Sequence, residues 1–377
     1  MAQAIRRVSF LILVLTCLGA QPQRPAENVS AQLLRQYEEA PETAIRRVVE
    51  ERLDVRAAVF ALRKDTTAPV RLRAALALEL AFAGLRDDMA PRPLRNPAAD
   101  MGSSRQKPII FADVFNAAFD LATSVKDGEP FVTAWHEAAL AMLEGGAEVP
   151  PTAVTGSGAS AHLLETFLDR TVGTFDKGRW HLARASVHER VIAEILDYEW
   201  PTYRGSHPAS GNTVGALIEG NLARARTAAL LELQKAREDE PYRALADIHI
   251  AQILLERNKR DDLTEALARV KDAPGLSLAP STLYLARLIE GRIEEALGRG
   301  SEATAAFRAA TQTIPGADAA AFSLASRLYL EGDRIQADAL VRQVFAARDV
   351  TDPWSFFLMP EYETWETKLQ AVRVQRR

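Results

Sequence analysis

Apolar residues recur along most of the chain at intervals of three and four, the spacing that places them on one face of an α-helix. From Ser30 to about residue 88 the pattern predicts three or four helices, with starts at Ser30, Pro41 and Asp54. Residues 70–85 are apolar on nearly every side, so we expect that helix to be buried between neighbours. Alternating runs of β-branched residues are scarce. The pattern predicts an all-α protein.

Three segments rich in Pro, Gly or Ser interrupt the helical pattern, at 91–108, 145–160 and 201–211. The first of them separates an N-terminal helical region, expected at 28–90, from a middle helical region, expected at 109–235, which contains the other two. A repeat region at 242–350 and an aromatic tail at 351–377 follow.

Residues 1–20 have the layout of a secretory signal peptide: Arg6 and Arg7, then an apolar run, then the small residues Gly19 and Ala20. The run is shorter than the roughly 20 residues that a membrane-spanning helix needs. We expect an exported protein, periplasmic or secreted, with no stable membrane span after signal removal. A lipoprotein acylated at Cys17 is one alternative, and an uncleaved anchor is another.

Spaced small and large residues recur near the C-terminus. Gly298, Ala303, Phe307, Ala310 and Pro315 follow one another in the segment GRGSEATAAFRAATQTIP. This segment resembles the second half of a tetratricopeptide repeat (TPR).

The next unit repeats the spacing, because one family period, about 34 residues, separates Gly298 from Gly332 and also Ala303 from Ala337. Leu324, Ala325 and Leu328 supply the large, small, large pattern of the first helix. The resemblance is clearest over 280–350 and weaker from 243.

The resemblance implies a helical-hairpin solenoid with a right-handed superhelical twist, in which small residues let antiparallel helices approach and the glycines turn the chain. The N-terminal half is expected to hold either a divergent helical repeat or hairpins of another type. In such repeats the first helices line a concave face. Here that face would present the residues Ile248, Gln252, Phe322, Ser326 and Tyr329.

Composition narrows the possible functions. The formal charge is −4 and no block of like charge gathers along the chain, which argues against a nucleic-acid partner. Cys17 is the one cysteine and lies in the predicted signal peptide, so we expect neither a disulfide nor a thiolate site in the mature chain.

Candidate chemistry is sparse. His181 and His188 share one predicted helix face, with Glu189 or Glu165 as a conceivable third ligand, but two helical turns separate them by about 10 Å, too far to share one ion. The pair formed by His136 and Glu137 lacks the second histidine of a zinc-protease motif.

The run from Gly156 to Ser160 lacks the lysine of a phosphate-binding loop and the preceding strand of a hydrolase turn, so we expect a flexible connector there. The tail is unusual for its aromatic residues, which are Trp354, Phe356, Phe357, Tyr362 and Trp365. We expect the tail to cap the last repeat; a docking motif is the alternative.

The sequence therefore predicts an exported scaffold that binds a protein or peptide of unknown identity, with no enzyme activity, no cofactor and no metal. Two alternatives stay open: a structural subunit of a cell-envelope complex, and a helical cell-wall-acting enzyme within 109–235.

Overall fold

The computed structural model describes residues 26–51, 53–89, 107–126, 129–145, 158–196, 212–272, 278–347, 350–357 and 365–376. All regular secondary structure in these ranges is helical, as the sequence pattern predicts. The predicted signal peptide and Cys17 lie outside the described residues. The chain forms two compact units, one of residues up to Ala138 together with Thr367–Arg377, the other of Ala139–Glu366. The division falls inside the predicted middle region 109–235.

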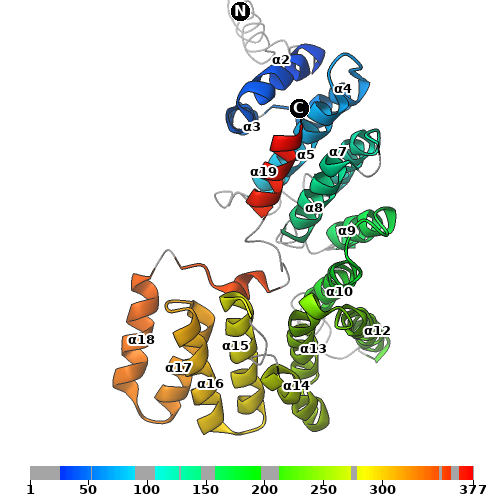
Figure 1. Cartoon of the computed structure of the whole chain (residues 1–377). Coiled ribbons are helices and arrows are strands. Elements are labelled where there is room, and N and C mark those ends of the chain that lie inside the picture. Colours follow the sequence, from blue (N-terminus) through cyan, green and yellow to red (C-terminus); the bar gives the residue numbers. More distant parts are fainter. Residues whose placement is uncertain are drawn as a thin grey trace, which may run out of the picture. The chain divides into compact units, whose positions relative to one another are not determined.

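The first unit is built from short helices that surround one apolar helix (Figure 1). Its helices are α2 (Ala26–Glu39), α3 (Pro41–Glu50), α4 (Val55–Lys64), α5 (Val70–Met89), α7 (Lys107–Ala122), the first part of α8 (Pro130–Gly145) and α19 (Trp365–Gln375). Residues Leu72–Ala81 of α5 are largely buried. This confirms the burial predicted for a helix with apolar residues on nearly every side.

Two predicted helix starts have different outcomes. Asp54 caps α4, because its side chain accepts a hydrogen bond from the backbone N–H of Ala57 at 2.9 Å. Ser30 does not start a helix: α2 begins at Ala26 and Ser30 is buried within it.

The helix α19 joins the end of the chain to the first unit through charged contacts. Glu79 of α5 accepts two hydrogen bonds from Arg373, at 2.8 and 2.7 Å, and a third from the hydroxyl of Tyr37. Lys368 pairs with Glu137 at 2.7 Å, and Arg376 donates to the carbonyl oxygen of Glu38 at 3.0 Å. The buried carboxylate of Glu79 is thus neutralised from the other end of the chain.

The second unit consists of helices that follow one another mainly as antiparallel pairs (Figure 1). They are α9 (Gly158–Arg170), α10 (Lys177–Glu194), α12 (Asn212–Ala236), α13 (Arg243–Arg257), α14 (Arg260–Asp272), α15 (Pro280–Ala296), α16 (Gly300–Thr313), α17 (Asp318–Leu330) and α18 (Arg334–Ala346), with the 3₁₀ turns η3 (Glu240–Tyr242) and η5 (Pro353–Phe356). One continuous apolar core extends from Leu182 to Phe357. This arrangement agrees with the predicted helical-hairpin fold.

The turns inside the last three pairs share one backbone device. Asn258, Gly298 and Gly332 follow α13, α15 and α17, and each has a positive φ, at 52°, 76° and 91°. A left-handed residue at this place ends a helix and reverses the chain, and glycine adopts it without a Cβ clash. The turn role predicted for the two glycines is confirmed.

Small residues also let the helices of a pair approach closely. A Cβ at Gly291 of α15 would lie 2.4 Å from the ring of Phe307 on α16. Ala303 and Ala310 are fully buried on the same helix as Phe307, and Ala325 and Ala337 are buried in the next pair. The Phe307 ring therefore fills the space that the missing side chain of Gly291 leaves.

Candidate protein-interaction surface

The five residues predicted to face a partner have different surroundings. Ile248 of α13 is fully buried in the core, so it offers no exposed surface. Gln252, one turn later, is partly exposed and donates to Glu256 at 2.9 Å. Phe322, Ser326 and Tyr329 are exposed on α17, with Phe322 at 41% and Tyr329 at 54%. The structure thus leaves one exposed stripe, on the first helix of the last pair.

Residues Asp352–Phe357 of the tail, here called the η5 segment, lie on the neighbouring first helices. The carboxylate of Asp352 accepts hydrogen bonds from the hydroxyl of Tyr284 on α15 at 2.9 Å and from the backbone N–H of Ala319 on α17 at 2.6 Å. It also caps η5 by accepting from the N–H of Trp354 at 2.7 Å. Burial and the nearby charge of Asp352 raise the pKa of Tyr284 above its ordinary value.

Two aromatic rings fix the rest of the η5 segment. Trp354 lies against the guanidinium of Arg292 on α15, 4.0 Å from ring centroid to Cζ. The ring of Phe357 is buried and stacks on His249 of α13 with a centroid separation of 4.3 Å. The chain's own tail therefore covers part of the α13 and α15 surface.

The predicted tail 351–377 falls into two parts. The η5 segment contacts α13 and α15, whereas residues from Thr367 belong to the first unit. The side chains of Phe356, Tyr362 and Trp365 lie outside the described residues. Ile335 and Phe345 on α18 are 85% and 67% exposed, so the described part of the tail does not form the expected cap over the outer side of the last pair.

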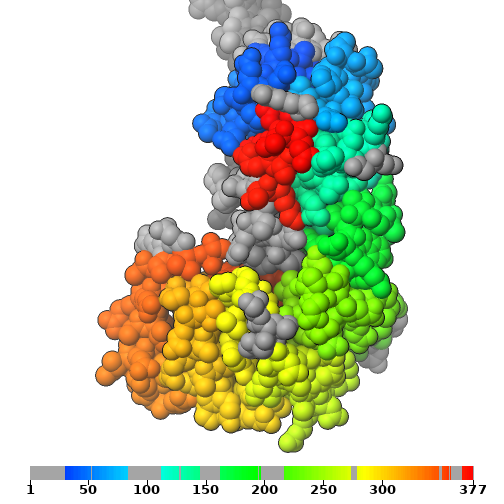
Figure 2. Space-filling view, viewed as in Figure 1, coloured from blue at the N-terminus to red at the C-terminus, as the bar shows by residue number. Residues whose placement is uncertain are grey.

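The last pair carries a group of exposed apolar side chains, here called the terminal apolar surface. Its members are Phe322, Tyr329, Leu330, Ile335 and Phe345. In Figure 2 the atoms of α17 and α18, in orange, lie at one edge of the second unit. Intrachain contacts orient three of the rings: Phe322 packs edge-on against Phe345 at 6.4 Å, and Arg334 lies 5.1 Å from the ring of Tyr329. Large apolar side chains that are exposed together are typical of an interaction site.

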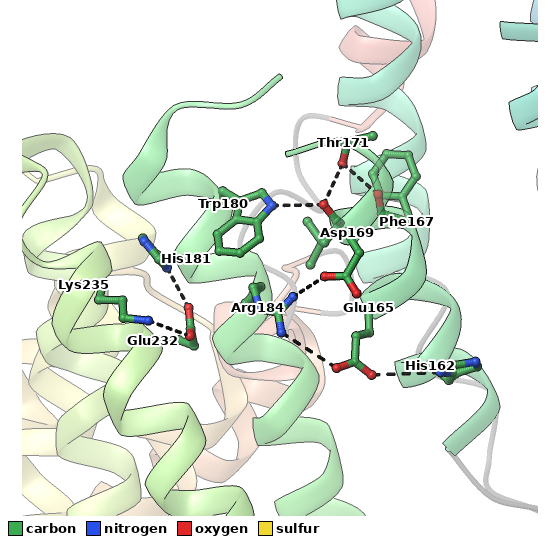
Figure 3. A network of polar contacts seen from close by, with 11 residues as sticks. His162, Glu165, Phe167, Asp169, Thr171, Trp180, His181, Arg184, Glu232 and Lys235 are labelled. Carbon is green, nitrogen blue, oxygen red and sulfur yellow. Dashed lines mark hydrogen bonds and ion pairs between the residues drawn. The ribbon is translucent and has the colours of Figure 1, made fainter. Parts of the chain in front are cut away.

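Helix α10 contains the two histidines that the sequence analysis considers for metal binding. His181 points to α12 and its Nδ1 lies 2.6 Å from Glu232, whereas Arg184 points to α9 and pairs with Asp169 at 2.6 Å (Figure 3). Burial raises the pKa of Glu232, but the hydrogen bonds from His181 and Lys235 outweigh it and leave that pKa below its ordinary value. Burial and the nearby Arg184 lower the pKa of His188.

Further charged residues of α10 are buried and paired. Arg179 forms a double hydrogen bond with Glu144, at 2.9 and 2.5 Å. Arg190 donates to the carbonyl oxygens of Leu143 and Glu144 at the end of α8, and burial lowers its pKa to about 10. Glu189 meets Nδ1 of His249 at 2.8 Å. Helix packing explains these contacts, because each buried charged group forms hydrogen bonds to a neighbouring helix.

Other expected features of the sequence have definite places. Gly158–Ser160 begin α9, so the end of the predicted flexible connector is helical instead. His136 stacks on Phe119 with a centroid separation of 5.7 Å. Within the described ranges, groups of three or more His, Cys, Asp or Glu side chains that could hold a metal ion are absent.

Sequence reasoning missed the residues that receive the η5 segment, namely Tyr284, Arg292 and His249. One of them carried a detectable signal, since His249 stands between the apolar residues Ile248 and Ile250 of α13. Their partners could not be inferred, because Trp354 and Phe357 are far away in the sequence.

No helix among the described residues has the length and apolar character that crossing a membrane requires. In comparisons with known proteins, no protein-family model matches the chain and no curated protein is similar to it.

Proposed function

We propose that the protein is an exported, TPR-like scaffold that binds a protein or peptide partner on the first helix of its last pair. The observation that carries the proposal is the exposed stripe of Phe322, Ser326 and Tyr329 on α17. These residues are spaced by four and three, so they lie on one face of the helix. Large exposed aromatic residues on one helix face are typical of partner recognition.

The η5 segment supports α17 as the place of binding. It covers part of α13 and α15 through His249, Tyr284 and Arg292. While the η5 segment stays in place, a partner can reach α17 but not the covered part of α13 and α15. The proposal therefore rests on Phe322, Ser326 and Tyr329. It leaves out Ile248, which is buried, and Gln252, which lies on α13 and donates to Glu256.

The geometry of the aromatic residues suits tight binding. Phe322 is held by Phe345, and Tyr329 is held by Arg334, so little side-chain freedom is lost when a partner docks. Aromatic side chains with few rotamers often dominate the binding energy of an interface. We expect Phe322 and Tyr329 together to contribute about 1–4 kcal/mol.

Export is proposed because residues 1–20 contain, in order, the basic, apolar and small-residue regions of a secretory signal peptide. An exported scaffold would meet its partner in the periplasm or outside the cell. Mass spectrometry of protein purified from its native host tests this part. A new N-terminus near Gln21 supports export, and intact cytosolic protein contradicts it.

The binding proposal is tested with a double variant, Phe322→Ala with Tyr329→Ala. A partner is first captured from the envelope fraction with the parent protein, identified by mass spectrometry and purified. Its affinity is then measured by calorimetry for the parent, the double variant and a matched control.

The control is Leu217→Ala with Leu231→Ala, which removes two exposed apolar residues from α12. We expect the double variant to bind at least about tenfold more weakly and the control to bind like the parent. Circular dichroism melting must show that both variants are folded. If the folded double variant binds as tightly as the parent, the proposed site is wrong.

A further inference from the structure

The outer face of α18 has a pattern that the proposed binding site does not use. Ile335 and Phe345 are largely exposed, and between them lie Asp338 and Arg342, which are also exposed. The spacing of the four residues is three, four and three, which places them on one face. Ala337, which is buried, anchors the opposite side of the helix to the core.

The four residues are arranged symmetrically about the middle of the helix. Ile335 and Phe345 are equally distant from Leu340, and so are Asp338 and Arg342. When two copies of such a helix lie side by side in antiparallel orientation, each apolar residue faces the other apolar residue and each charge faces the opposite charge. A parallel arrangement would instead place Asp338 beside Asp338 and Arg342 beside Arg342, which is repulsive.

We propose that α18 is the contact between two copies of this chain, which associate about a twofold axis with their α18 helices antiparallel. Ile335 of each copy packs on Phe345 of the other, and Asp338 of each copy pairs with Arg342 of the other. The twofold axis doubles every contact, so the interface contains two apolar contacts and two ion pairs.

Charge complementarity favours a second copy over an unrelated partner. An arbitrary partner requires no mirror arrangement on this helix, whereas a twofold contact requires that the surface complement itself. The apolar ends and charged centre of the stripe meet that requirement. Phe345 also packs against Phe322 within the same chain, so its ring is oriented before a second copy docks.

The size of the surface determines the strength of association. A contact formed mainly by one short helix from each copy falls at the small end of specific interfaces, so the dimer is expected to dissociate with a constant on the order of 10–100 µM. The dimer therefore forms and separates reversibly. It does not depend on the proposed binding function, because its charged centre lies on α18 and the binding stripe lies on α17.

The test is sedimentation equilibrium of the purified full-length protein and of charge-reversed variants. In the variant Asp338→Arg, the introduced arginine faces Arg342 of the second copy, and in Arg342→Asp the introduced aspartate faces Asp338 of the second copy. Both contacts bring like charges together, so each single variant should associate at least about tenfold more weakly than the parent. The variant with both reversals restores opposite charges across the contact. It should return to within about threefold of the parent dissociation constant.

Mixing the two single variants separates a contact between copies from an effect inside one helix. Asp338 and Arg342 are also one turn apart in the same chain, where Arg342 donates to the carbonyl oxygen of Asp338 at 3.1 Å. Repulsion within one chain persists after mixing, whereas a contact between chains becomes attractive in the mixed pair. We therefore expect the mixture to form a heterodimer about as strong as the parent dimer.

Arg308→Asp on α16 reverses an exposed charge away from α18 and serves as the matched control. It should leave association unchanged, and circular dichroism should show equal helix content for all variants. The proposal is overturned if the parent stays monomeric up to about 200 µM, well above the expected range. It is also overturned if the single variants dimerise like the parent, or if the mixed variants fail to associate.

Discussion

The helices α10 and α18 belong to the same unit, but α10 buries charged side chains whereas α18 exposes large apolar ones. On α10, Arg179, Glu189 and Arg190 are buried, and each forms hydrogen bonds to a side chain or a helix end on another helix. On α18, Ile335 and Phe345 are largely exposed. From residue type alone, the charged residues of α10 would be expected in water and the large apolar residues of α18 in the core.

The difference separates residues that hold the fold together from residues left for a partner. A charge in the core is tolerated only when it is paired, so the charged residues of α10 specify how α8, α12 and α13 pack against it. Large apolar residues in water contribute little to the stability of the folded chain. Those of α18 are therefore free to serve an interface.

The largest expected effect is at Arg179. Arg179→Ala leaves the carboxylate of Glu144 buried without its double hydrogen bond, so the free energy of unfolding should fall by about 3–5 kcal/mol. Urea denaturation measures the change in the free energy of unfolding, and circular dichroism follows the loss of helix.

Two matched variants sharpen this result. Arg184→Ala on the same helix removes a partly exposed pair with Asp169 and should cost about 1 kcal/mol or less. Ile335→Ala on α18 should change stability by less than about 0.5 kcal/mol. Equal losses for Arg179→Ala and Ile335→Ala would end the distinction between the two helices.

A smaller effect is expected at the close contact between α15 and α16. Gly291→Ala places a Cβ against the ring of Phe307, which should destabilise the second unit by about 1–3 kcal/mol. Gly220→Ala on α12 is the matched control, because no atom lies near the added methyl group there. The control should be neutral or stabilising by up to about 1 kcal/mol, through better helix propensity. Thermal melting of both variants tests the contrast, and equal melting temperatures would contradict it.

The smallest effect concerns the pH dependence of stability at Glu232. Its pKa is lower in the folded protein, so the charged form is stabilised there. That contribution is complete above the ordinary carboxyl value of 4.5 and is lost as the pH falls through the lower folded value. Glu232→Gln should remove it, so the melting temperature should fall less steeply below pH 4.5 than in the parent. Parallel curves for the two proteins would show that the pair with His181 adds nothing.

Much of the fold could be predicted because its signals are local. Helical periodicity predicts the helices, and Gly298 and Gly332 mark turns at the spacing of one repeat. Gly291 was missed although a glycine within a helix is itself a signal of close packing.

The exposure of the candidate binding residues was predicted in part. Phe322, Ser326 and Tyr329 are exposed as expected, but Ile248 is buried and its neighbour His249 meets the tail instead. One residue along a helix rotates the side chain by about 100°, so a small error in phase exchanges a core position for a surface position. The contacts of the η5 segment and of α19 could not be predicted, because they join residues distant in the sequence.

The central claim is that a partner binds the α17 stripe, and photo-crosslinking in the native host tests it most directly. A photoreactive residue replaces Ser326, which is exposed between Phe322 and Tyr329, and a second protein carries it at Leu231 on α12. The account predicts one discrete adduct from position 326 that disappears when Phe322 and Tyr329 are both alanine, and none at position 231. The same adducts from both positions, or an adduct at 326 that persists in the alanine variant, would contradict it.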